Sequence, residues 1–232
     1  MTSILTEPLT LPAPLVRSGD RPLVERLASR IATSVDELAV FQTASRAVDA
    51  LAESVFAGKR VTLARPAGDR IARVAWGAAR SATEVAAQPF DTLVAAARES
   101  DVLVLTSPLP AGGRRSATIT PRELLLLRSR APRPVIVLDL LEEDFARTPL
   151  TQPALLLPGT LVLRGFGQLW RDAGATNLSD IAFVAGPRDL IASLSAPALP
   201  TTLVEKAGAD LDLPGLDRRV QEAAALGRPA AT

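Results

Sequence analysis

The sequence contains no cysteine, no histidine and no tyrosine, and only 3% of its 232 residues are aromatic. Without cysteine there can be no disulfide and no thiol nucleophile. Without histidine, a Ser-His-Asp triad and a zinc site of His/Cys type are excluded as well. Any acid–base chemistry would therefore fall to carboxylates or to the two lysines, Lys59 and Lys206. The acidic run 142–144 is more typical of a solvated turn than of a metal site, so no metal is predicted.

Targeting and binding signals are also missing. The amino-terminal residues lack the basic start and apolar core of a signal peptide. No apolar run is long enough to span a bilayer. The formal net charge is +1, with acids and bases interspersed, so no membrane and no nucleic-acid partner is expected. Together with the absence of disulfides, these features predict a cytoplasmic protein.

What the chain does contain is a regular alternation of two patterns. Apolar residues make up 47% of it, enough for a substantial core. Short apolar runs typical of buried strands alternate with segments whose apolar residues recur at helical spacing. This predicts an α/β fold of three layers, α/β/α, with a mostly parallel sheet. Strands are expected at 37–41, 60–64, 83–87, 101–108, 134–139, 160–166 and 181–186, and helices at 23–32, 44–58, 68–79, 90–100, 120–130 and 187–194.

The ends of the chain have a different composition from the middle. Residues 1–22 hold four prolines and little periodicity, which predicts an extended arm. Residues 23–195 carry the alternating pattern and form the predicted main domain. Residues 196–232 are again rich in proline and are interpreted as a tail with one helix.

Three segments carry a resemblance to a known family. They are DVLVLTSPLPAGG (101–113), RAPRPVIVLDLLEEDF (130–145) and LVLRGFGQLWRDAGATNLSDIAFVAGPRDLI (161–191). In order and spacing they resemble fold-type I pyridoxal-phosphate-dependent aminotransferases, especially the histidinol-phosphate aminotransferase branch. The resemblance runs from about Glu37 to Leu194 and implies the large-domain fold of that family. The family's small domain, with its substrate-binding arginine, has no counterpart here.

Residue by residue, the resemblance implies a degenerate site. The Schiff-base lysine of the family falls on Gln168, whose amide cannot form a Schiff base because that bond needs a primary amine. Asp139 matches the aspartate that pairs with the pyridinium nitrogen of the cofactor. Ser45 survives at a helix start that holds phosphate in the family, and a helix amino terminus is a natural anion site. Gly167 and Thr176 fall where the family has a hydroxyl and an arginine for phosphate.

Further family positions are also replaced. Leu109, Glu142 and Gly68 fall near or on positions where the family has an asparagine, a tyrosine and an aromatic ring around the cofactor. Asp139 has an alternative interpretation as an aspartate that caps the turn after its strand. Trp76 and Trp170 could line a pocket, but packing in the core or at an interface is the favoured interpretation, because the chain has few large rings.

These losses predict a non-catalytic binding or interaction protein with no catalytic residue and no firmly bound cofactor. The family builds its sites across a dimer interface, so a homodimer is expected. Two alternatives stay open. One is a transaminase-type enzyme that binds pyridoxal phosphate non-covalently over Asp139, although the chain offers no histidine as a base. The other is a heteromeric partner subunit that completes the active site of a second, intact chain.

Overall fold

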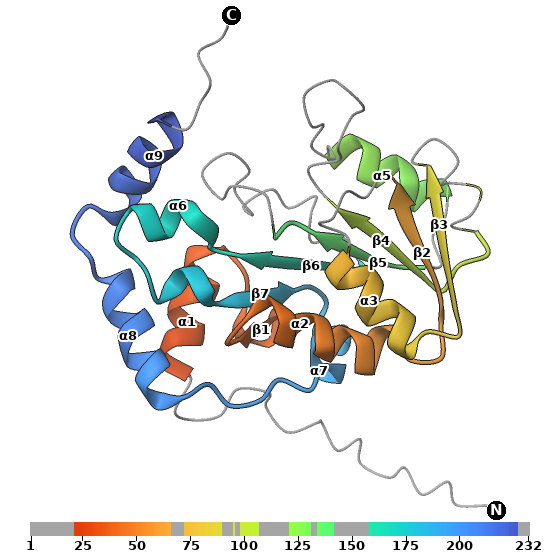
Figure 1. Ribbon diagram of the computed structural model, residues 1–232, viewed down its shortest axis with the longest axis horizontal. Coiled ribbons are helices and arrows are strands. Elements are labelled where there is room, and N and C mark those ends of the chain that lie inside the picture. The colour runs from red at the N-terminus through yellow and green to blue at the C-terminus, as the bar shows by residue number, and fades with distance from the viewer. Residues whose placement is uncertain are drawn as a thin grey trace, which may run out of the picture.

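The protein folds around one seven-stranded sheet, shown in Figure 1. The computed structural model describes residues 21–65, 72–89, 98–106, 121–130, 134–141 and 158–226, together with residue 95. The strands lie in the order β1-β7-β6-β5-β4-β2-β3. Their bounds are β1 (Leu38–Phe41), β2 (Arg60–Arg65), β3 (Glu84–Pro89), β4 (Val102–Thr106), β5 (Val135–Asp139), β6 (Thr160–Gly165) and β7 (Ala182–Ala185).

Strand β7 is the one strand of this sheet whose direction is opposite to that of the other six. It pairs antiparallel with β1 and with β6, whereas the pairs β6–β5, β5–β4, β4–β2 and β2–β3 are parallel. Consequently the carboxyl ends of all six strands from β1 to β6 lie at one edge of the sheet, the carboxyl edge. The predicted mostly parallel sheet and all seven predicted strands are confirmed.

Helices cover both faces of the sheet, as the three-layer prediction requires. They are α1 (Arg21–Arg30), α2 (Ala44–Leu51, continued by the π-helical turn Ala52–Phe56), α3 (Ala72–Ser81), α5 (Pro121–Arg130), α6 (Gly167–Asp172), α7 (Arg188–Ser193), α8 (Thr201–Leu211) and α9 (Leu216–Leu226). Short 3₁₀ turns lie at Val35–Glu37 and at Leu178–Asp180.

Two apolar clusters form the core, one on each side of the sheet. On the first face, buried side chains of α1, α5, α6, α8 and α9 pack against Leu138 and Val162. On the second face, buried side chains of α2, α3 and α7 pack against Val137 and Leu163. Neighbouring residues of a strand point to opposite faces, so each buried strand needs apolar residues at every position. That requirement explains the continuous apolar runs in the sequence.

The carboxyl-terminal segment differs from the prediction of one helix in a tail. It contains two helices, α8 and α9, and both pack on the domain. The linker before α8 crosses from one face to the other, because Leu194 belongs to the second core cluster and Leu199 to the first. In Figure 1 this linker runs past the β1 end of the sheet, and α8 and α9 lie beside α1 and α6.

Charged contacts attach α8 and α9 to α1. The Arg26 guanidinium donates to both carboxylate oxygens of Asp212, at 2.6 and 3.3 Å, and to the carbonyl of Gly208 at 3.1 Å. Arg30 forms an ion pair with Asp217. Its guanidinium also lies 4.9 Å from the ring centroid of Trp170 in α6. These contacts make the two helices part of the folded domain.

Candidate functional site

The topology of the sheet points to the carboxyl edge as the place for a ligand. The connection from β2 through α3 leads outward to β3, whereas the connection from β4 through α5 leads the other way to β5. The two helices accordingly lie on opposite faces, since Ala78 of α3 belongs to the second core cluster and Leu124 of α5 to the first. In open α/β sheets, ligands bind outside the carboxyl ends of the strands at such a reversal. Here the reversal lies between β2 and β4.

Asp139 is the last residue of β5, and β4 lies between it and this reversal. Its side chain is buried, with 3% of the residue exposed. One carboxylate oxygen, Oδ1, accepts the backbone N–H of Leu141 at 3.1 Å. The turn-capping interpretation of Asp139 therefore describes a real contact. It does not exclude a second role, because a carboxylate has about four acceptor sites.

Thr106 ends the neighbouring strand β4 and is the register partner of Asp139. It is 5% exposed. Its hydroxyl oxygen is buried and has no hydrogen-bond partner among the residues that the structure describes. The sequence pattern indicates no role for Thr106. The only hint in the sequence is its position, because it is a polar residue at the end of an otherwise apolar strand, at the carboxyl edge.

Gln168 lies in the first turn of α6, which follows β6 directly. Gly167 opens this helix with a φ of +67°, a value that favours glycine. The helix is held by its aromatic residues: Phe166 and Trp170 are both 3% exposed, and their rings meet edge to face at 4.9 Å. The interpretation of Trp170 as a core residue is confirmed.

The two lysines of the chain lie elsewhere. Lys59 is exposed in the turn immediately before β2, hence at the edge of the sheet opposite to Asp139. Lys206 is exposed on α8, a helix that packs mainly on α1 and on the Leu178–Asp180 turn. Neither amine is placed beside Asp139 or the start of α6.

Ser45 lies in the first turn of α2 and is exposed. This helix follows β1, so its amino terminus is at the carboxyl edge as well. Thr43 is the residue that caps it, accepting the N–H of Arg46 at 3.3 Å. Ser45 and Asp139 thus share an edge of the sheet, but β7 and β6 separate their strands.

The loop that contains Thr176 is held by acidic residues. Asp210 of α8 is 7% exposed, and its carboxylate accepts the N–H groups of Asn177 and Leu178 at 2.7 and 3.0 Å. The nearby Arg171 donates to Asp180 at 2.7 Å. Thr176 itself is exposed. Arg171, which lies near the family's arginine position but not at it, is therefore engaged by a carboxylate.

Several predicted positions lie outside the described residues: residues 1–20 of the arm, Gly68, Leu109 and Glu142 with the rest of the acidic run. Within the described part of the chain, no group of three or more potential ligands could hold a metal ion. The helices described there also include none that is long and apolar enough to cross a membrane.

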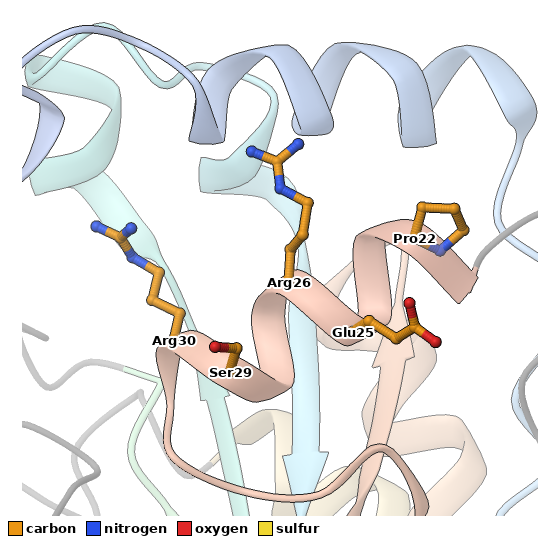
Figure 2. Close-up of a pocket in the computed structure, with 5 residues that line it drawn as sticks. All are labelled: Pro22, Glu25, Arg26, Ser29 and Arg30. Atoms are coloured by element: carbon orange, nitrogen blue, oxygen red, sulfur yellow. The ribbon is translucent and has the colours of Figure 1, made fainter.

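A hollow of about 580 Å³ lies along the exposed side of α1, lined by Pro22, Glu25, Arg26, Ser29 and Arg30. Figure 2 shows the Arg26 side chain reaching from α1 toward the neighbouring helix, and Arg30 extending from the end of α1. Their guanidinium groups are engaged by Asp212 and Asp217. The hollow is therefore a gap beside the attachment of α8 and α9, away from Asp139.

Solved structures are similar to this fold, although no protein-family model matches the chain and a search of curated proteins found no match. L-Threonine-O-3-phosphate decarboxylase from Porphyromonas gingivalis superimposes with a TM-score of 0.65 at 19% identity, covering 88% of this chain and 64% of that one. Histidinol-phosphate aminotransferase from Clostridium acetobutylicum gives 0.68 at 14%, covering 94% and 65%.

A third similar structure is histidinol-phosphate aminotransferase from Sinorhizobium meliloti in complex with pyridoxal 5'-phosphate, with a TM-score of 0.64 at 16% identity, covering 93% of this chain and 60% of that one. The chain spans less than two thirds of each of these proteins. At such identities the likeness establishes the fold, which is that of the fold-type I aminotransferases, as the sequence resemblance predicted.

The residues present do not fit pyridoxal phosphate held by a bond to a lysine of this chain. Such a bond needs an amine at the carboxyl edge. The chain has two lysines, and both lie elsewhere, while Gln168 carries an amide.

Proposed function

We propose that this chain is a non-catalytic binding protein on an aminotransferase large-domain fold, holding a small ligand without a covalent bond at the carboxyl edge beside Asp139. The observation that carries the proposal is the placement of the lysines. The edge where an open α/β sheet binds ligands has a buried carboxylate but no lysine amine. Such a site can bind and orient a ligand, but it has no lysine amine with which to form a covalent bond.

The ligand class follows from Asp139. A buried carboxylate interacts best with a cationic N–H group, because such charge-assisted hydrogen bonds are stronger than neutral ones. A protonated nitrogen of a ring or an amine meets this requirement. Pyridoxal phosphate, bound non-covalently, is the second candidate occupant, and Asp139 is the residue that favours it.

Assembly is a separate part of the proposal. Leu125 on α5 is 49% exposed, whereas Leu124 and Leu127 beside it are buried. A single exposed leucine is normal on a protein surface, so the proposed assembly rests on the resemblance to a family whose members build their sites across a dimer interface. We propose that the partner is a second copy of the chain, and that the protein works in the cytoplasm.

The test of the binding mode uses pyridoxal phosphate as a chemical probe for an amine in the site. Purified protein is incubated with the probe, reduced with borohydride and digested for peptide mass spectrometry. We expect no specific fixation on Lys59 or Lys206. A matched control replaces both lysines by arginine, which keeps the charge and removes the amines. The wild type and this variant should give the same absorbance spectrum.

Two outcomes would contradict the proposal. Stoichiometric fixation on Lys59 or Lys206 would show that a lysine does reach the ligand. Robust transamination by Gln168→Lys would show that the rest of a catalytic site is in place, since catalysis needs all its groups positioned together.

A further inference from the structure

The hydroxyl of Thr106 is a buried polar group that has no hydrogen-bond partner in the part of the chain that the structure describes. The residue is 5% exposed, and its Oγ1 lacks a hydrogen bond to any described residue. A buried hydroxyl left in this state destabilises the protein that carries it. Valine has nearly the same shape and no hydroxyl, so packing alone gives no reason for threonine here.

A second threonine in the same sheet shows the usual solution. Thr62 in β2 is also 5% exposed, but its hydroxyl lies 2.5 Å from that of Ser100, with which it shares a hydrogen bond. Ser100 precedes β4, so this pair lies toward the amino ends of the strands. Thr62 and Thr106 are therefore the same residue type with the same burial. They differ in that the Thr62 hydroxyl has a hydrogen-bond partner and in the edge of the sheet to which they are closer.

Thr106 and Asp139 share one face of the sheet. They are register partners on adjacent parallel strands. Two residues earlier the partners are Val104 and Val137, which both belong to the second core cluster. Because side chains alternate between faces along a strand, Thr106 and Asp139 point to the same face as these valines. Both residues end their strands at the carboxyl edge, and Thr106 borders the reversal between β2 and β4.

We propose that Thr106 is a ligand-binding residue: its hydroxyl hydrogen-bonds a polar atom of the ligand whose cationic N–H group meets Asp139. The ligand is then a small molecule with a protonated nitrogen and a hydrogen-bonding substituent close to it. This inference rests on the proposed function, because it adds a residue and a specificity to that non-covalent site. It also gives the unsatisfied hydroxyl a physical explanation, since the ligand satisfies it.

The test compares Thr106→Val with Thr62→Val, and uses pyridoxamine phosphate as the probe. This probe has a ring nitrogen and polar substituents but no aldehyde, so it cannot form an imine with any lysine. Without probe, Thr106→Val should raise the melting temperature, because a buried hydroxyl with no described partner is removed, whereas Thr62→Val should lower it, because the hydrogen bond between Thr62 and Ser100 is lost. In calorimetric titrations Thr106→Val should weaken probe binding about tenfold, the loss of one hydrogen bond. Thr62→Val should leave binding unchanged.

The variant Asp139→Asn distinguishes a failure of the Thr106 role from a failure of the proposed ligand site. If Asp139→Asn weakens binding and Thr106→Val does not, the proposed site stands and the role of Thr106 is wrong. A lower melting temperature for Thr106→Val would likewise overturn that role, because it would reveal a structural partner. If the wild type binds no probe at millimolar concentration, or binds an analogue with carbon in place of the ring nitrogen equally well, both the Thr106 inference and the cationic-ligand site are refuted.

Discussion

The attachment of α8 to the Leu178–Asp180 turn offers a sharp test of the fold, through the substitution Asp210→Ala. The Asp210 carboxylate is nearly buried and accepts two backbone N–H groups, from Asn177 and Leu178, and the side-chain amide of Asn177. Alanine removes the acceptor and leaves the two backbone donors unsatisfied. The substitution should therefore destabilise the whole domain.

The magnitude follows from those contacts. Hydrogen bonds to a charged acceptor contribute about 1.5–3 kcal/mol each, so two backbone bonds give about 3–6 kcal/mol. Alanine's better helix propensity recovers about 0.5 kcal/mol, and the loss of a negative charge near the carboxyl end of α8 recovers up to about 1 kcal/mol. We expect a net loss of about 3 kcal/mol. For a chain of this size that corresponds to a melting temperature lower by roughly 6–12 °C.

The assay is thermal and urea-induced unfolding of the full chain, with Asp212→Ala as the matched control. Asp212 lies two residues further along, its side chain is 73% exposed, and its contact is the ion pair with Arg26. Exposed pairs contribute about 0–1 kcal/mol. If Asp210→Ala proved as mild as Asp212→Ala, then α8 would be a dispensable tail, and the placement of α8 in the folded domain would be wrong.

Two further predictions concern acid stability and assembly. Hydrogen bonds from the hydroxyl and the backbone N–H of Ser34 hold the pKa of Glu37 below its ordinary value of about 4.3. A lowered pKa contributes stability that is present above the ordinary value and is lost as the pH falls through the folded one. The difference in stability between wild type and Glu37→Gln should therefore be constant near neutral pH and shrink below about pH 4.3; a difference that grows on acidification would contradict the assignment. Light scattering at micromolar concentration should give the mass of a dimer, and Leu125→Glu should lower it; a monomeric wild type would refute the proposed self-association.

Much of the fold was predictable because its strands are buried on both faces. A strand such as Val135–Asp139 must be apolar throughout, and a run of this kind is visible without any knowledge of its neighbours. The helices that escaped prediction lack such a local signal. Helix α6 begins among the glycines Gly165 and Gly167, which indicate a loop, and it forms because Phe166 and Trp170 pack into the first core cluster. Helix α8 is rich in small residues, and Asp210 and Arg26 hold it through partners distant in sequence.

The sequence by itself determined which chemistry the protein lacks. A chain with no histidine, no cysteine and an amide at Gln168 has few reactive groups, whatever its fold. Only the tertiary structure decided where the remaining groups lie. It placed Lys59 at the edge opposite to Asp139, and it brought Thr106 beside Asp139 from a different strand. Among the described residues, it gave the hydroxyl of Thr62 a hydrogen-bond partner and that of Thr106 none. Burial and hydrogen-bond satisfaction depend on contacts between distant parts of the chain, and a local pattern of residues does not encode them.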